Sequence, residues 1–354
     1  MKRICVDARM MGASGIGTHL KSILTRLKED GRFNLILLCQ ENQREPLKAF
    51  SSRLITMKSA IYTFKEQLEY VKKIPRCELF WAPHFNVPLL PIRAKKRLTT
   101  INDLYHLAHF DSLSFAQKVY ARLMYNAAFV LSDCVVTISE FSKRELFRLA
   151  NWMPKKVCVA PCPLDFLPPL NPSSKGNFLL AVGNLKPHKN LHRLVKAYTA
   201  LQPEEPLYIV GKKEGFITRD EPLFQEVENN PFLKQKIFFL GEVSDDKLKE
   251  LYTRARLFIF PSTYEGYGYP PLEAMACGCP VVASRVASIP EVCGDAVEYV
   301  DPFCIDSIAG GIKRLLADPL RCQELVQKGH TLVARIKRVN NQMADIIDAC
   351  CNYP

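Results

Sequence analysis

Hydrophobic positions along this chain follow two alternating patterns. Short apolar runs are typical of buried strands, whereas apolar residues three and four apart mark one face of a helix. Ile4–Ala8 is a run of the first kind, and helical spacing follows over Ile16–Leu27. The alternation continues, with further strands expected at 35–39, 79–82, 98–101, 134–138 and 157–160 and helices at 64–73, 115–131 and 140–150. Strands that alternate with helices favour a parallel, doubly wound α/β sheet.

A proline-rich segment over 161–172 interrupts this alternation, because neither a helix nor a central strand continues through it. Beyond it, strands are expected at 178–182, 207–210, 237–240, 257–260 and 280–283, and helices at 191–201, 245–255, 272–276, 308–316 and 323–351. A length of 354 residues also suits two domains. We expect an N-terminal domain over 1–165, a second over 173–335 and a helical tail over 336–354. One surface against which this tail could pack is the N-terminal domain.

Composition excludes several classes of protein. Every apolar run is shorter than the ~18 residues that span a bilayer, and the chain start lacks the layout of a signal peptide. The 13 cysteines include no Cys-x-x-Cys pair, so we expect scattered thiols in a reducing cytosol rather than disulfides or a zinc ribbon. The net charge of +12 favours an anionic partner. No nucleic-acid module is recognisable, and the densest basic run, Arg93–Arg97, is expected to be a solvated loop.

Glycines at 12, 15 and 17 follow the first predicted strand and open the first helix. Glycine allows a backbone to approach a phosphate closely. Leu20 stands where the last glycine of a dinucleotide fingerprint belongs, so a nicotinamide cofactor is not expected. On this segment alone, a ligand loop and a plain tight turn remain equal alternatives.

A basic segment, Gly183–Asn190, follows the first strand of the second domain. It places Lys186, His188 and Lys189 at the carboxyl end of a strand, where open α/β sheets bind ligands. Positioned cations neutralise phosphate leaving groups. The alternative is a basic loop with Asn190 as a helix cap.

Glu265 and Glu273 flank a segment rich in glycine, tyrosine and proline. Two prolines favour a helix start, and we expect Glu273 in the first turn of that helix. A helix N-terminus favours anions, and carboxylates accept hydrogen bonds from sugar hydroxyls. This combination suits a nucleotide-sugar.

Together these segments resemble the retaining glycosyltransferases of the GT-B fold, in the large group 1 or GT4-type family. The resemblance runs from Ile4 to about Leu316 and is most specific in Gly183–Asn190, in the Glu265 and Glu273 pair, and in Gly278–Val282 and Ser288–Ala296. It implies two Rossmann-like domains facing across a cleft, with the donor on the second domain and the acceptor on the first.

By this resemblance, Glu273 binds the ribose of the nucleotide-sugar and Glu265 binds a hydroxyl of the donor sugar. Lys189 binds the diphosphate, and the backbone N–H groups of Tyr267 and Gly268 approach the diphosphate or the sugar. The implied mechanism is transfer with retention and without a metal, which agrees with the lack of any Asp-x-Asp motif.

The resemblance also assigns the glycine-rich and basic segments to the donor. Gly15 and Gly17 close on it from the first domain, and Gly183, Asn184 and Lys186 line its diphosphate. Family members often carry arginine near the position of Asn184, so here the two lysines balance the charge.

A second departure is Asn102-Asp103, where many family members have His-Asp. Both residues are candidates for the catalytic centre. Asparagine carries no titrating proton at pH 7, so the role of Asn102 is restricted to hydrogen bonding.

The expected function is transfer of a hexose, mannose or glucose, from a donor such as GDP-mannose or UDP- or ADP-glucose. The product belongs to cell-surface or lipid-linked polysaccharide. Alternatives are a GT-B epimerase or phosphorylase, or a nucleotide-sugar-binding protein without turnover.

The basic run at 93–97 and the aromatic helix at 115–125 point to a lipid-linked acceptor and to peripheral attachment at the inner face of a membrane. An ordinary basic surface over a core helix is equally compatible with these residues.

Overall fold

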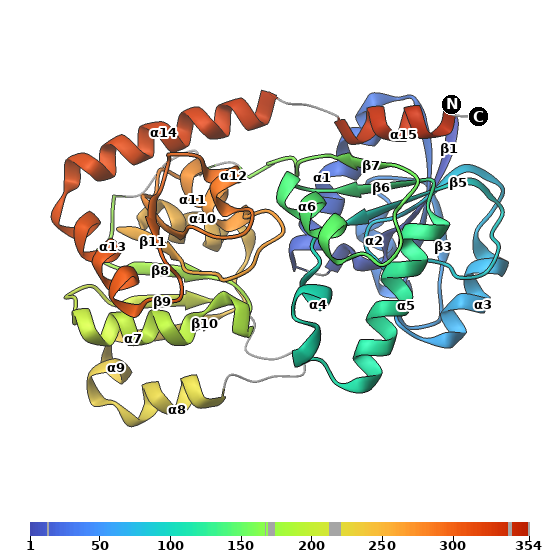
Figure 1. The fold of residues 1–354 in the computed structure, drawn as a ribbon. Coiled ribbons are helices and arrows are strands. Elements are labelled where there is room, and N and C mark those ends of the chain that lie inside the picture. The colour runs from blue at the N-terminus through green and yellow to red at the C-terminus, as the bar shows by residue number, and fades with distance from the viewer. Residues whose placement is uncertain (13, 167, 169–173, 212–220, 339–341, 353–354) are drawn as a thin grey trace. The chain divides into compact units, whose positions relative to one another are not determined.

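The computed structural model describes residues 1–354 except 13, 167, 169–173, 212–220, 339–341 and 353–354 (Figure 1). Position 13 of the glycine segment, much of the proline-rich segment and short parts of the tail therefore lie outside the described residues. The chain divides into unit 1, Met1–Pro163 with Val339–Pro354, and unit 2, Leu164–Arg338. Each unit contains one parallel sheet, which confirms the predicted doubly wound α/β class.

Unit 1 has a seven-stranded sheet in the order β3-β2-β1-β4-β5-β6-β7. Its strands are β1 (Lys2–Asp7), β2 (Phe33–Cys39), β3 (Arg53–Thr56), β4 (Cys77–Ala82), β5 (Ala94–Ile101), β6 (Cys134–Thr137) and β7 (Val157–Val159). Its α-helices are α1 (Ser14–Asp30), α2 (Arg44–Leu47), α3 (Phe64–Lys73), α4 (Tyr105–Ala108), α5 (Phe115–Leu131), α6 (Glu140–Leu149) and α15 (Gln342–Asn352). The chain runs from β1 outward to β3 and then returns to β4 beside β1, so the topological switch point lies between β1 and β4.

Alternating side chains of β1 supply two hydrophobic layers. Ile4 and Val6 belong to a core shared with α1 and α15. Cys5 belongs to the opposite core, which contains buried residues of α3, α5 and α6. A strand buried on both faces reads as a continuous apolar run, which is why the pattern of β1 was detectable.

Unit 2 has a six-stranded sheet in the order β10-β9-β8-β11-β12-β13. Its strands are β8 (Leu179–Val182), β9 (Leu207–Val210), β10 (Ile237–Gly241), β11 (Leu257–Phe260), β12 (Val281–Ser284) and β13 (Glu298–Val300). Its α-helices are α7 (Leu191–Leu201), α8 (Glu221–Asn229), α9 (Pro231–Lys236), α10 (Asp245–Arg254), α11 (Tyr269–Ala276), α12 (Ile289–Cys293), α13 (Ile305–Ala317) and α14 (Pro319–Arg338). The switch point lies between β8 and β11, so the carboxyl ends of these two strands are the expected ligand edge.

Several expectations about elements were incomplete or wrong. The short strands β3 and β13 and the helices α2, α4, α8, α9 and α12 were not predicted. The basic run was expected to be a loop, but Ala94–Arg97 begins β5. Arg97 Nη1 and Nη2 donate to the carbonyls of Pro88 and Leu90 at 2.8 and 2.9 Å. The guanidinium group of Arg97 is therefore partly occupied by hydrogen bonds within unit 1. No described helix combines the length and the apolar character needed to cross a membrane.

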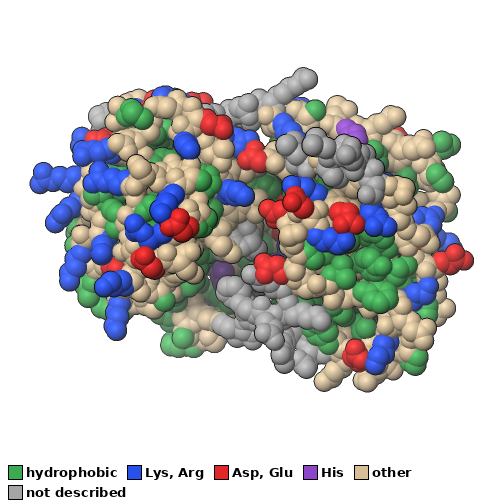
Figure 2. Space-filling view, turned by 180° about the vertical axis from the view of Figure 1, so that it is seen from behind, with side chains coloured by type: hydrophobic (Ala, Val, Ile, Leu, Met, Phe, Trp, Pro, Cys, Tyr) green, Lys and Arg blue, Asp and Glu red, His purple; other side chains and the backbone are tan. Residues whose placement is uncertain are grey.

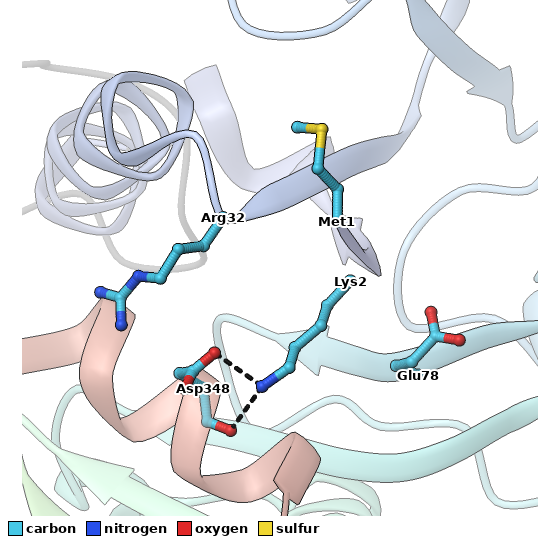
Figure 3. Close-up of a pocket in the computed structure, with 5 residues that line it drawn as sticks. All are labelled: Met1, Lys2, Arg32, Glu78 and Asp348. Atoms are coloured by element: carbon cyan, nitrogen blue, oxygen red, sulfur yellow. Dashed lines mark hydrogen bonds and ion pairs between the residues drawn. The ribbon is translucent and has the colours of Figure 1, made fainter.

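The helix α15 completes unit 1 although it ends the described chain. Met343, Ala344, Ile347 and Cys350 are buried in the core that contains Ile4 and Trp81. At the amino end of β1, Lys2 Nζ donates to Asp348 Oδ1 at 2.6 Å (Figure 3). The pocket drawn there is lined by Met1, Lys2, Arg32, Glu78 and Asp348, at the amino edge of the sheet and thus away from the switch-point edge.

Packing of α15 can be tested by replacing Ile347, which is fully buried. Ile347→Ala should lower the free energy of unfolding of unit 1 by about 2–4 kcal/mol, because it removes buried methyl groups and leaves a cavity. Asp348→Ala, which removes only a partly exposed ion pair, should cost less than about 1 kcal/mol. Urea unfolding followed by tryptophan fluorescence measures this, since Trp81 and Trp152 both belong to unit 1. Equal losses in the two variants would contradict the packing role.

Candidate active site

The basic segment of unit 2 leaves the carboxyl end of β8 and forms a short 3-10 helix, Pro187–Lys189, before α7 begins. The stem of Lys189 lies over Gly183, where an added Cβ would come within 3.3 Å of the lysine Cδ. Gly211 approaches the same loop so closely that its Cβ would lie 2.0 Å from the Gly183 carbonyl oxygen. Glycine at these two positions therefore permits the tight packing that holds Lys189 at the sheet edge.

Asn190 joins this segment to two other loops. It occupies the N-cap position of α7, with φ of 60°, but its side chain makes no capping bond, so the side-chain cap of the alternative interpretation is not formed. Instead Asn190 Nδ2 lies 3.0 Å from the Pro261 carbonyl and 2.7 Å from the Pro302 carbonyl. The amide thereby fixes the basic segment against the loop that follows β11.

Lys189 and Glu265 form an ion pair. The lysine Nζ lies 2.6 Å from Glu265 Oε1, and the two side chains are only 16% and 14% exposed. The Thr263 backbone N–H donates to the His188 carbonyl at 2.8 Å and aligns the two loops. Two predicted site residues that are 76 positions apart thus meet directly, a pairing that the sequence did not reveal.

Ser288 fixes the turn that carries Glu265 through contacts with two backbone carbonyls. Its hydroxyl lies 2.9 Å from the Glu265 carbonyl and 2.7 Å from the Tyr267 carbonyl. Gly268 has φ of 122°, a conformation that disfavours any side chain, and α11 begins directly after it. These contacts fix the backbone conformation at the positions predicted to approach a ligand.

Glu273 lies in α11, but not where it was expected. The helix begins at Tyr269, so Glu273 is its fifth residue and lies beyond the first turn. The expected position of Glu273 in the first turn, at the N-terminus of the helix, is therefore wrong. Tyr252 of α10 donates its hydroxyl to Glu273 Oε2 at 3.1 Å. Burial raises the pKa of Glu273 to about 7, and the hydrogen bond from Tyr252 opposes that rise.

In unit 1, Asn102 and Asp103 follow the carboxyl end of β5. Asp103 Oδ1 accepts the Tyr105 backbone N–H at 3.0 Å and so turns the chain into α4. Asn102 Nδ2 donates to the Pro83 carbonyl at 3.0 Å, and Asn102 Oδ1 lies 3.1 Å from His19 Nδ1. The histidine, on α1, is buried, and burial lowers its pKa to about 4.

Gly17 is required by packing at the start of α1. A Cβ there would lie 2.3 Å from the Met11 carbonyl oxygen, so a side chain would displace the helix. A Cβ on Gly15, by contrast, would meet no atom within 4 Å. Gly17 thus positions the helix that carries His19, whereas Gly15 borders open space.

The predicted residues fall into two separate groups. Unit 2 brings together Lys189 and Glu265, with Gly183, Tyr267 and Gly268 in the same loops, and it places Glu273 in α11. Unit 1 holds Gly15, Gly17, Asn102 and Asp103. Two contact residues were missed, His19 and Tyr252, because each reaches its partner from a helix distant in sequence. The spacing of His19 two positions after Gly17 was the only available signal for the first.

Comparison with known proteins identifies the family. The family described as "Glycosyl transferases group 1" matches residues 166–331. O-antigen chain mannosyltransferase B of Escherichia coli is 31% identical, over 78% of this chain and 73% of that protein. O-antigen chain mannosyltransferase RfbU of Salmonella typhimurium is 30% identical, over 88% of this chain and 90% of that protein.

The chain belongs to the group 1 glycosyltransferases. Its fold is also shared by solved structures: Anabaena HepE, in complex with UDP-glucose, superposes with a TM-score of 0.77 at 17% identity, over 99% of this chain and 100% of that chain. The predicted family, GT-B fold and enzyme class are therefore confirmed, while the role of each site residue stays a prediction.

The raised pKa of Glu273 predicts a pH-dependent stability for unit 2 of this glycosyltransferase. Below pH 4.5 the carboxyl is protonated in both folded and unfolded chains, and the full stability is present. As the pH rises to and through 7, the unfolded state ionises more readily, so the wild type should lose about 3 kcal/mol relative to Glu273→Gln. Urea unfolding at several pH values, followed by circular dichroism, measures the difference.

Tyr252→Phe provides a matched control for this titration. It removes the hydrogen bond that favours the charged carboxylate, so the loss of stability should extend to higher pH than in the wild type. A pH profile that is the same in the wild type and in Glu273→Gln would show that Glu273 is not the titrating group.

Proposed function

We propose that this glycosyltransferase moves a mannosyl group from a nucleoside-diphosphate mannose to a hydroxyl of a lipid-linked glycan, with retention at the anomeric carbon. The two relatives described above are named O-antigen chain mannosyltransferases, which supports the sugar and the product class. The UDP-glucose held by HepE supports a nucleotide-sugar as the donor.

The observation that carries the proposal is the Lys189–Glu265 ion pair at the carboxyl edge of the unit 2 sheet. A cation and a carboxylate at 2.6 Å offer one partner for a diphosphate oxygen and one for a sugar hydroxyl. Each group holds the other in place before the donor arrives, so neither side chain must be ordered at the moment of reaction.

In the proposed reaction, the bond from the anomeric carbon to the diphosphate breaks as the acceptor oxygen bonds to the same carbon, and the proton of the acceptor hydroxyl passes to the departing diphosphate. Negative charge grows on the diphosphate, and the ammonium of Lys189 stabilises it. Glu265 holds the donor sugar, and Glu273, as a carboxylate, binds the ribose hydroxyls. Gly15, Gly17, Lys186 and the backbone at Tyr267 and Gly268 complete the donor contacts.

Donor preference can be measured directly with purified protein. In a thermal-shift screen of GDP-mannose, UDP-glucose and ADP-glucose, the mannose donor should raise Tm most, because a ligand that binds only the folded state stabilises it. A larger shift with a glucose donor would overturn the mannose assignment. Conversion of the donor to another nucleotide-sugar without any acceptor would indicate an epimerase, and binding without transfer would indicate a protein that has lost turnover.

The ion pair can be tested by Lys189→Ala, which should lower kcat/KM by about 100-fold or more through loss of charge stabilisation in the transition state. Lys196→Ala on the exposed side of α7 is the matched control and should retain wild-type activity. Circular dichroism must show that both variants are folded. A folded Lys189→Ala enzyme with full activity would remove the donor-site assignment.

The charge distribution supports an anionic partner for unit 1, because this unit is strongly basic. Unit 1 contains 26 Lys and Arg against 15 Asp and Glu, a net charge of +11, whereas unit 2 contains 22 against 21, a net charge of +1. Figure 2 shows a face of unit 1 on which blue Lys and Arg side chains dominate. Nearly all of the net positive charge therefore belongs to the unit predicted to bind the acceptor.

Exposed apolar residues accompany this charge. On α5, Phe115, Val119 and Leu123 recur every four positions and are 83%, 53% and 52% exposed. Tyr62, just before α3, packs edge-on against Tyr120 of α5, with ring centroids 5.9 Å apart. Phe64 and Leu68 continue the exposed apolar side chains on α3. Apolar residues beside basic ones are the composition of helices that lie in a membrane interface. We propose that this surface attaches the enzyme to the inner, anionic face of a membrane.

Co-sedimentation with vesicles tests this attachment. The wild type should bind vesicles containing anionic phospholipid and bind neutral vesicles much less, with an affinity that falls as salt rises. Phe115→Ser with Val119→Ser should weaken binding about tenfold or more, whereas Leu320→Ser, at an exposed apolar site on unit 2, should not. No binding to anionic vesicles at low salt would refute a membrane partner.

A further inference from the structure

The amide of Asn102 has only one orientation compatible with its neighbours. Its partner on one side is the Pro83 carbonyl at 3.0 Å, which can only accept, so the NH₂ group must face it. The Asn102 carbonyl oxygen therefore faces His19 Nδ1 at 3.1 Å. Because an amide oxygen only accepts, His19 must carry its proton on Nδ1.

This tautomer leaves His19 Nε2 as a bare hydrogen-bond acceptor. Burial lowers the pKa of His19 to about 4, so the ring is neutral at physiological pH and Nε2 keeps its lone pair. Within the described part of the chain, Nε2 is buried and has no hydrogen-bond partner. A buried acceptor left without a donor costs about 1–3 kcal/mol, so such an atom requires a reason.

For two other buried atoms of unit 1 without a hydrogen-bond partner, in His84 and Arg9, the surroundings supply such a reason. His84 Nδ1 accepts the Asn86 backbone N–H, so its Nε2 carries a proton, and the rings of Tyr62 and Phe85 pack edge-on against it. Arg9 has one unpartnered nitrogen, but its other nitrogens bind Asp7, Glu66 and Tyr70. Of these three atoms, only His19 Nε2 is a bare acceptor, because His84 Nε2 and the Arg9 nitrogen both carry protons.

The position of His19 suits a ligand. Its hydrogen-bonded chain passes through Asn102, which follows β5, to Pro83, which follows β4. Both strands end at the carboxyl edge of the unit 1 sheet, and β4 adjoins the switch point. Open α/β sheets bind their ligands at this edge. Gly17, which cannot carry a side chain, fixes the helix turn from which His19 projects.

We propose that His19 Nε2 binds a sugar hydroxyl of the substrate by accepting its hydrogen bond, and that Asn102 is the positioning residue that sets the tautomer. In this proposal Asn102 does not replace the histidine that many family members carry at its position, because its function is to fix the tautomer of His19. The proposal rests on the sugar transfer proposed above. The hydroxyl belongs either to the donor sugar or to the acceptor sugar, and kinetics separates the two.

A matched pair of variants tests the proposal. In His19→Asn, the short amide can still donate to Asn102 but places nothing at the position of Nε2. In His19→Gln, the longer amide can present an oxygen near the position of Nε2. His19→Asn should lower kcat/KM by about 10-fold to 100-fold, because one sugar hydroxyl loses its acceptor. His19→Gln should recover a large part of that loss, although its contact with Asn102 is weaker.

The measurements are kcat and KM for each substrate, with Tm for every variant. A raised KM for the nucleotide-sugar assigns the hydroxyl to the donor, and a raised KM for the glycan assigns it to the acceptor. If His19→Asn keeps both KM values and kcat within about twofold, the proposal is wrong. It is equally wrong if activity in the two variants follows Tm rather than the presence of an acceptor atom, because that is the result of a structural role.

The proposed function is examined separately in the same assay. Wild-type protein that fails to transfer mannose but uses another donor would overturn the mannose assignment, and the His19 variants are then compared with that donor. Lys189→Ala serves as the inactive reference. A loss in Lys189→Ala without any loss in His19→Asn would refute the role of His19 and leave the proposed transfer intact.

Discussion

The common direction of the strands is the constraint on which both units depend. In a parallel sheet every strand ends at the same edge, so residues that follow different strands become neighbours whatever their distance in sequence. Lys189 follows β8 and Glu265 follows β11, and these strands are adjacent at the switch point of unit 2. Asn102 follows β5 and Pro83 follows β4, which are adjacent in unit 1. The chemistry of the two units is thus a consequence of strand order.

Hydrophobic periodicity predicted most of the fold because most strands are buried on both faces and most helices have one apolar face. It missed β3 and β13, which lie at or near the sheet edges and have few apolar residues. It also misread the start of β5, where Ala94–Arg97 is basic because that end of the strand is only partly buried. A strand of three or four residues is too short for its hydrophobic pattern to be distinguished from that of a loop.

The site was predictable where its signal is local. Glycine, lysine and glutamate at short spacings identified Lys189, Glu265 and Glu273 as candidates. Their partners were not predictable, since the contact of Glu273 with Tyr252 and that of Asn102 with His19 depend on helix placement in three dimensions. The substitution of Asn102 for histidine suggested a lost group when only the sequence was considered. The structure shows that a histidine on α1, His19, lies within hydrogen-bond distance of that asparagine.

The return of α15 to unit 1 has a consequence for the order in which the protein is made. Unit 2 is one continuous stretch of chain, whereas the core of unit 1 includes Ile347 and Ala344 at the far end of the sequence. During synthesis, the segments of unit 2 leave the ribosome before the last helix of unit 1 does. Until then, the β1 face that α15 covers is without its partner. Unit 1 is the first to begin and the last to be finished, and its incomplete core must stay soluble while unit 2 folds.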